Sequence, residues 1–182
     1  MNQTTGLKRN IIDKYYTSKE TVELCIGLLK TNVLINKEDL CIEPSAGNGA
    51  FIKHIKLLTT HHRFYDLEPD NSKTLENEIK KQDYLLLDLK KIELHKFGKI
   101  HIIGNPPFGR QSSMAIKFIK KSAEFCDSIS FILPKSFKKD SLKKHFPLKF
   151  HLILEKDLPD NSFIINNTPY NVPCVFQIWE KK

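Results

Sequence analysis

The chain has 182 residues, of which 40% are hydrophobic and 27% charged, a composition typical of a folded globular protein and unlike that of disordered or fibrous chains. No apolar run approaches the roughly 20 residues of a membrane-spanning helix, and the opening residues lack the charged and apolar regions of a signal peptide. We therefore expect an intracellular protein with no membrane partner, folded as a single domain over residues 1–182. The formal net charge of +8 favours an acidic partner such as nucleic acid.

The cysteines and histidines give no sign of a disulfide framework or a metal centre. The four cysteines are far apart in the sequence and each lies in an apolar stretch, so we expect buried, reduced thiols. The pair His61-His62 has no partners at the spacing of metal ligands, and we expect no metal site. The cysteines are Cys25, Cys41, Cys126 and Cys174.

Helix and strand signals alternate along the chain. A capping box, Thr17-Ser18-Lys19-Glu20, precedes a first helix with apolar residues at helical spacing. A second helix carries Phe51, Ile55 and Leu58 on one face, and further helices are expected over residues 71–81 and 112–124. Strands are expected over residues 40–42, 63–67, 84–87, 99–103, 129–133, 150–155 and 173–180.

This alternation predicts an α/β fold, in which a mostly parallel sheet of seven strands has helices on both faces. The last two strands have no strong helix between them, which predicts an antiparallel hairpin at one edge of the sheet. Ligands of such sheets bind outside the carboxyl ends of the strands. The residues expected at that rim are Glu43 with Gly47-Asn48-Gly49, then Asp66 and Glu68, then Asp83-Tyr84, and Asn105-Pro106-Pro107-Phe108.

The tetrapeptide Asn105-Pro106-Pro107-Phe108 directly follows an apolar strand. Each proline fixes φ near −65° and lacks an N–H, so the backbone there is stiff and its carbonyls are free to accept hydrogen bonds from a ligand. The asparagine adds an acceptor oxygen, and an aromatic face follows it. This combination suits a flat ring that bears an amino group, although an isolated Asn-Pro-Pro is more often a surface turn.

The glycine turn after the first strand lacks the third glycine of a dinucleotide fingerprint and the Gly-Lys-Ser/Thr of a phosphate loop, which argues against NAD and ATP. An acid, Glu43, precedes the turn and suits a ligand with positive charge. An acid after the second strand can take a ribose diol, and one beside the third strand can accept from an exocyclic amine. A cationic amino-acid end, a ribose and an adenine together describe S-adenosylmethionine.

The chain resembles class I S-adenosylmethionine-dependent methyltransferases that methylate amino groups, above all the catalytic domain of gamma-type N6-adenine DNA methyltransferases. The similarity covers nearly the whole chain in the family's motif order. It is carried by Lys14-Tyr15-Tyr16-Thr17, by the loop Glu43-Pro44-Ser45-Ala46-Gly47-Asn48-Gly49-Ala50-Phe51, by Asp66, by Asp83-Tyr84, by Asn105-Pro106-Pro107-Phe108 and by Ile132-Leu133-Pro134.

The resemblance implies a Rossmann-like fold, S-adenosylmethionine as cofactor and methyl transfer to the N6 amine of adenine. The implied catalytic residues are Asn105, Pro106, Pro107 and Phe108, with Phe108 stacking on a flipped base. The implied cofactor-binding residues are Tyr16, Thr17, Glu43, Pro44, Ser45, Ala46, Gly47, Asn48, Gly49, Phe51, Asp66, Leu67, Asp83, Tyr84 and Asn105. Phe163 is the best candidate for a second stacking aromatic, with Tyr170 as runner-up.

The chain departs from that family in one respect, because the sequence ends after the last expected strand and has no large target-recognition domain. Substrate readout would then come from the lysine-rich segment 135–149, from the arm over residues 1–17, or from a specificity-conferring protein subunit. Within that segment only Asp140 opposes the lysines, and those expected to contact nucleic acid are Lys135, Lys138 and Lys139.

Several alternatives stay open at this point. DNA is slightly favoured over RNA as the substrate. Guanine-N2 ribosomal RNA methyltransferases share Asn-Pro-Pro-Phe, and glutamine-N5 protein methyltransferases use Asn-Pro-Pro-Tyr on the same fold. An inactive partner of a catalytic subunit is a further alternative, against which the intact Asn105 and glycine loop argue.

Overall fold

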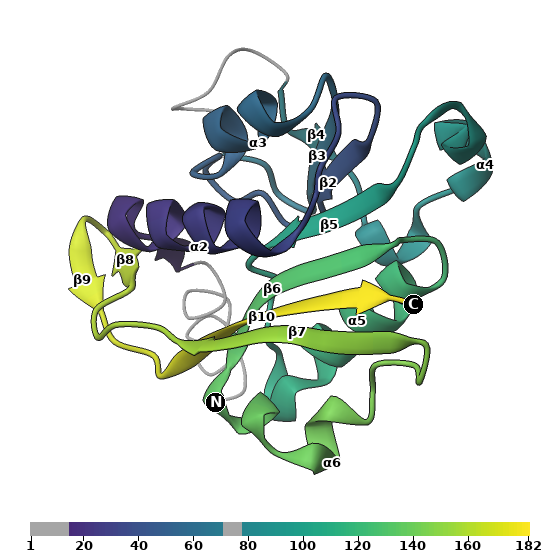
Figure 1. The fold of residues 1–182 in the computed structure, drawn as a ribbon. Helices are drawn as coiled ribbons and strands as arrows, with labels where there is room; N and C mark the ends of the chain where they lie inside the picture. Colours follow the sequence, from purple (N-terminus) through teal and green to yellow (C-terminus); the bar gives the residue numbers. More distant parts are fainter. Residues whose placement is uncertain (1–14, 71–77) are drawn as a thin grey trace.

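A computed structural model describes residues 15–70 and 78–182 of the chain. Within them, seven strands form one mixed sheet in the order β4-β3-β2-β5-β6-β10-β7 (Figure 1). The strands from β4 to β6 are parallel, and β10 pairs antiparallel with both β6 and β7. Their bounds are β2 (Leu40–Glu43), β3 (His61–Asp66), β4 (Lys80–Lys81), β5 (Ile100–Gly104), β6 (Ser128–Pro134), β7 (Phe150–Asp157) and β10 (Cys174–Lys181).

A second, smaller sheet lies beside the carboxyl ends of the parallel strands. It consists of β1 (Tyr16–Thr17), β8 (Phe163–Ile165) and β9 (Thr168–Tyr170), all antiparallel. The β8–β9 hairpin belongs to the connection between β7 and β10, in which no strand is expected from the sequence. Figure 1 shows this hairpin beyond the start of α2 (Lys19–Asn32).

Helices cover both faces of the large sheet. On one face, α2 and α3 (Ile52–Leu58) bury apolar residues against Cys41, Ile103 and Ile178. On the other face, α5 (Ser113–Ala123) packs against the alternate residues of the same strands. The remaining short elements are α4 (Leu89–Ile92), α6 (Asp140–Lys143) and the 3-10 turns η1 (Tyr84–Leu86), η2 (Leu94–Lys96), η3 (Arg110–Ser112) and η4 (Lys135–Lys138).

The predicted architecture is confirmed: the sheet has seven strands, is mostly parallel, carries an antiparallel edge and has helices on both faces. The cap of the first helix lies one residue later than predicted, because Ser18 accepts a hydrogen bond from the Thr21 N–H. No helix in the described part of the chain is long and apolar enough to cross a membrane.

The predicted third strand is wrong. Residues 84–86 form the 3-10 turn η1, because the Asp83 side chain accepts a hydrogen bond from the Leu85 N–H at 3.0 Å and turns the backbone. Tyr84 and Leu87 are buried while Leu86 is exposed, which is the spacing of a helical turn. The third strand of the parallel part of the sheet is instead β4, at Lys80–Lys81. These two residues are predicted to end a helix over residues 71–81, and that part of the prediction is wrong; residues 71–77 lie outside the described range.

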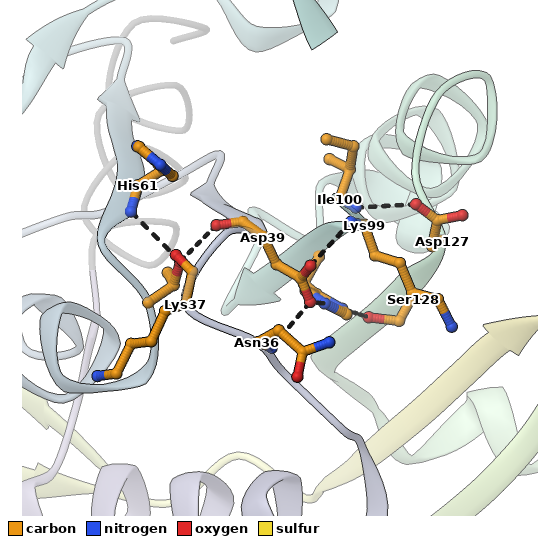
Figure 2. A network of polar contacts seen from close by, with 10 residues as sticks. Asn36, Lys37, Asp39, His61, Lys99, Ile100, Asp127 and Ser128 are labelled. Atoms are coloured by element: carbon orange, nitrogen blue, oxygen red, sulfur yellow. Dashed lines mark hydrogen bonds and ion pairs between the residues drawn. The ribbon is translucent and has the colours of Figure 1, made fainter. Parts of the chain in front are cut away.

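A buried polar network joins the amino ends of three parallel strands (Figure 2). The His101 ring lies 2.8 Å from the Asp39 carboxylate through Nε2 and 2.7 Å from the Ser128 hydroxyl through Nδ1. The same carboxylate accepts the backbone N–H groups of Asn36 and Lys99. Because β2, β5 and β6 begin at these residues, the network fixes the strands relative to one another at the edge opposite the rim predicted to bind ligand.

We expect Asp39→Asn to lower the free energy of unfolding by about 3 kcal/mol at pH 7, because the buried groups that now bond to the charged carboxylate would lose that charged acceptor. Burial alone would raise the pKa of Asp39, but its hydrogen bonds to Asn36, His101 and Lys99 outweigh burial and lower that pKa. The stability that Asp39 contributes is therefore present above the pKa of the unfolded chain and lost as the pH falls through the folded pKa.

Urea unfolding at pH 7 and pH 3 measures this difference, with Asp160→Asn on the surface as the matched control. A loss below about 1 kcal/mol at pH 7, which is the size of one ordinary hydrogen bond, would contradict the role of the network.

Candidate active site

The carboxyl ends of the parallel strands enclose a cavity of about 700 Å³. Small-molecule sites are typically about 300–1,000 Å³, so the cavity has room for a ligand of cofactor size. Every residue predicted to bind the cofactor lines it except Gly49, and Asn105, Pro106 and Pro107 line it as well. Residues predicted for catalysis or substrate binding that lie outside its lining are Phe108, Phe163, Lys135, Lys138 and Lys139.

The glycine loop after β2 is held against the end of β3. Gly47 has φ +59°, and a Cβ there would lie 3.2 Å from the Tyr16 ring, so both the backbone conformation and the close approach to β1 favour glycine. The Gly47 N–H donates to the Asp66 carboxylate at 2.8 Å, and the Glu68 N–H donates to the other oxygen at 2.9 Å. Asp66 therefore shapes the loop from the edge of the cavity where a ribose was expected.

Glu43, the last residue of β2, is buried at the base of the cavity with 1% exposure. Its Oε2 atom has no hydrogen-bond partner among the described residues. Burial, and then the negative charge of Asp66, raise the pKa of Glu43 well above its usual value. The neighbouring β5 ends in Gly104, where φ is +148° and a Cβ would meet the Glu43 side chain at 3.0 Å. The glycine at the end of β5 thus makes room for the Glu43 carboxyl group, whose Oε2 atom has no hydrogen-bond partner among the described residues.

Asn105 follows Gly104 directly and presents a second unsatisfied acceptor. Its Nδ2 donates to the Thr17 hydroxyl at 3.3 Å, which holds the side-chain amide in one orientation. Its Oδ1 is buried and has no partner among the residues that the structure describes. Buried polar atoms are nearly always hydrogen-bonded in folded proteins, so two orphaned acceptors on one cavity indicate a ligand that brings donors.

The aromatic residues around Asn105 are arranged differently from the prediction. Phe108 and Phe163 both contact the ring of Tyr15 edge-on, with centroids at 5.7 and 4.8 Å. Phe163 is fully buried, because β8 pairs with β1 and turns this side chain into the core. The prediction that Phe163 stacks on a substrate base is therefore wrong in this structure. Tyr170, the second candidate for the stacking residue, is 36% exposed, and its ring centroid lies 6.2 Å from that of Tyr15.

Tyr15 is a cavity residue that sequence reasoning left out of the site. The signal was present, since Tyr15 stands in the tetrapeptide Lys14-Tyr15-Tyr16-Thr17 that resembles a cofactor motif. Composition and spacing do not reveal that β1 pairs with β8 and thereby brings this ring next to Pro106.

The lysine-rich segment is less positive than its sequence predicts. Asp157 pairs with Lys138 at 2.9 Å and with Lys135 at 3.9 Å, and Glu155 pairs with Lys143 at 3.0 Å. Both acids lie on β7, outside the segment, so these lysines are opposed by more acids than the one, Asp140, that the segment itself contains. Lys139 and Lys144 are exposed and form no ion pair within the described ranges.

The aromatic residues of that segment belong to the core. Phe137 is fully buried, and Phe146 stacks on Trp179 with ring centroids 4.0 Å apart. All four cysteines are free and buried, and burial raises the pKa values of Cys41 and Cys174 to about 12. Among the described residues, no group of three or more His, Cys, Asp or Glu side chains could hold a metal ion.

The sequence matches no protein-family model and no curated protein. Solved structures do match. A candidate RNA methyltransferase from Pyrococcus horikoshii gives a TM-score of 0.69 at 14% identity, over 92% of this chain and 86% of that one. A candidate methyltransferase from Streptococcus mutans, solved in complex with SAH, gives 0.55 at 15% identity over 89% of this chain and 97% of that one.

The chain has the Rossmann-like fold of class I methyltransferases. A type I restriction-modification methyltransferase subunit from Streptococcus thermophilus shares this fold, with a TM-score of 0.67 at 14% identity over 93% of this chain. The match covers 45% of that subunit, so this chain corresponds to less than half of it. At such identities these likenesses establish the methyltransferase fold.

We expect Glu43→Gln to change how stability depends on pH. The pKa of Glu43 is higher in the folded protein than in the unfolded chain. The contribution of Glu43 to the free energy of unfolding is therefore fully present below the pKa of the unfolded chain and is lost as the pH rises through the pKa of the folded protein. Urea unfolding between pH 5 and pH 8 should therefore show a stability loss in the wild type that Glu43→Gln, which has nearly the same shape, does not share. Identical pH profiles for the two proteins would contradict the buried, strained state of this carboxyl group.

Proposed function

We propose that this protein is an S-adenosylmethionine-dependent methyltransferase that acts on the exocyclic N6 amine of adenine in nucleic acid, with DNA slightly favoured over RNA. The observation that carries the proposal is the pair of orphaned acceptors, Glu43 Oε2 and Asn105 Oδ1, on one cavity of cofactor size. One suits a cationic ligand and the other suits an amine N–H. The fold, and the SAH complex of a structural neighbour, support the choice of cofactor.

The cavity residues fit S-adenosylmethionine in their chemistry. Glu43 would face the ammonium group, Asp66 the ribose hydroxyls and Asp83 the adenine amine. The Asp66 and Asp83 carboxylates each already accept a backbone N–H, which fixes their positions while leaving further lone pairs for a ligand. When bound, this cofactor supplies an electrophilic methyl group on a sulfonium. No cysteine lines the cavity, which fits direct transfer to nitrogen without a covalent enzyme intermediate.

Asn105 would make the adenine amine nucleophilic. The lone pair of an exocyclic amine is delocalised into the ring, and hydrogen bonds from N6–H to Asn105 Oδ1 and to the Pro106 carbonyl favour the pyramidal nitrogen that attacks. Positive charge grows on that nitrogen in the transition state, so these acceptors stabilise the transition state more than the ground state. The hydrogen bond to Thr17 engages the Nδ2 end of the amide, so that Oδ1 remains without a partner among the described residues.

Nucleic acid is the substrate class favoured by charge. The chain carries +8 overall, and exposed lysines follow β6 beside the cavity rim. The names of the RNA and restriction-modification neighbours point the same way. The restriction-modification neighbour is named as one subunit of a larger system, and on that ground we further propose that a partner subunit supplies sequence recognition.

The direct test is incubation of the purified protein with methyl-labelled S-adenosylmethionine and separate pools of DNA, RNA and protein, followed by mass spectrometry of the digests. We expect N6-methyladenine in the DNA or RNA pool. Label found as N2-methylguanine, or as methylglutamine in the protein pool, would overturn the N6-adenine assignment.

We expect Asn105→Ala to lower kcat by about 10²–10³-fold, the usual effect of removing one preorganised transition-state partner. The dissociation constant for S-adenosylmethionine should change little, as measured by calorimetry. Thr17→Val, which removes the anchor of the amide, should cause a smaller loss of kcat. If Asn105→Ala instead abolished cofactor binding and left kcat unchanged in cofactor-saturated enzyme, Asn105 would have a structural role.

The lysine segment permits a matched comparison of charge. We expect the double variant Lys139→Ala, Lys144→Ala to weaken nucleic-acid binding and to reduce the slope of log K against log salt by about 1.4–1.8, for two lost phosphate contacts. The variant Lys138→Ala, Lys143→Ala removes the same charge from lysines that are already paired with acids, and its slope should change less. Equal slopes in both variants would show that this segment does not contact phosphates.

A further inference from the structure

A second cavity, of about 690 Å³, lies on the outer side of the glycine loop between α2, α3 and β8. Its lining contains the basic residues Lys19, Lys53, His54 and Lys56, and a single acid, Glu78. Thr17 and Asn48 line both this groove and the active-site cavity. We call it the α2–α3 groove.

The described lining of the α2–α3 groove carries a net positive charge. Lys56 forms an ion pair with Glu78, which is the only acid among the described lining residues. Lys19 and Lys53 are exposed and have no ion pair within the described ranges. Burial, and next the charge of Lys53, lower the pKa of His54; Glu23 on α2 opposes them, and Lys30 and Lys19 add smaller contributions that lower it. A cation in the first turn of a helix also opposes the helix dipole, so α2 itself gains nothing from Lys19.

The groove shares Thr17 with the active-site cavity. Thr17 lines both and accepts the hydrogen bond from Asn105. The active-site cavity on the other side of the glycine loop is lined by Asp66 and Asp83, whose carboxylates repel an anion. A nucleotide whose base lies against Asn105 must keep its sugar and phosphates outside that acidic cavity, and the α2–α3 groove offers a cationic surface that meets the cavity at Thr17.

We propose that the α2–α3 groove binds the phosphodiester backbone of the substrate next to the target nucleotide, through Lys19 and Lys53. This inference rests on the proposed function, since it assigns a path to the strand that enters the active site. It adds a second backbone contact on the far side of Asn105 from the lysines of η4 and α6. The substrate strand would then cross the rim of the sheet from one basic surface to the other.

The test compares two double variants of equal charge. Lys19→Ala, Lys53→Ala removes the groove cations, and Lys90→Ala, Lys91→Ala removes two exposed lysines of α4, which lies well away from α2 and α3 in Figure 1. The probe is a fluorescein-labelled single-stranded 12-mer with one adenine, in DNA and RNA forms, with anisotropy read over a series of salt concentrations. Calorimetry with S-adenosylmethionine and thermal melts accompany each variant.

We expect the groove variant to bind the oligonucleotide about tenfold more weakly at low salt and to lose about 1.4 from the salt slope, or about 0.7 for each single-strand phosphate contact. The α4 variant should stay within about twofold of the wild type. Lys19→Arg, Lys53→Arg should restore both affinity and slope. The melting temperature and the cofactor dissociation constant should be unchanged in all variants.

Four results would overturn the inference. Equal losses of oligonucleotide affinity in the two alanine variants would show that the effect comes from net charge alone. Weaker binding of S-adenosylmethionine by the groove variant would show that the groove lysines serve cofactor binding instead. A groove variant that methylates the oligonucleotide with wild-type KM would refute the backbone path while leaving the proposed function intact. If the wild type itself methylated no nucleic acid while binding the cofactor, the proposed function would fail and this inference with it.

Discussion

The structure depends on a contrast between the two ends of the same parallel strands. At their amino ends, the buried carboxylate of Asp39 is saturated by His101 and by two backbone N–H groups. At their carboxyl ends, Glu43 and Asn105 each bury an acceptor that no described residue satisfies. Each unsatisfied acceptor costs about 1–3 kcal/mol, so the sheet must be held firmly elsewhere to keep them in place. The satisfied network lies where it can do so, because it ties together the starts of β2, β5 and β6.

The charged side chains are also distributed differently inside and outside the cavity. Acids gather at the strand ends inside the cavity, where the pKa of Glu43 is raised by burial and by Asp66. Lysines lie outside, after β6 and around the α2–α3 groove. A cationic small molecule is therefore favoured inside and a polyanion outside. This separation is what an enzyme needs if it brings a sulfonium and a nucleic acid to one atom.

Much of the fold follows from the sequence because the central strands β2, β5 and β6 are apolar runs separated by helical or turn signals. The failures have two physical causes, a local capping hydrogen bond and pairing between distant segments. Tyr84 and Leu87 read as strand residues because the capping hydrogen bond of Asp83 is invisible to hydrophobicity. The pairing of β1 with β8 buries Phe163 and places Tyr15 on the cavity. Likewise, Asp157 and Glu155 neutralise lysines that lie more than ten residues away along the chain. The lining of the cavity was easier to predict than its surroundings, because its motifs are local and stand at strand ends.

The measurement that tests the central claim most directly is isothermal titration calorimetry of the protein with S-adenosylmethionine, in buffers of different ionisation enthalpy at one pH. If Glu43 is a neutral buried acid that ionises opposite the ammonium group of the ligand, binding will be one-to-one and will release protons, and Glu43→Gln will bind more weakly without that release. Absence of binding, or binding with the same proton count in the wild type and in Glu43→Gln, would contradict the account.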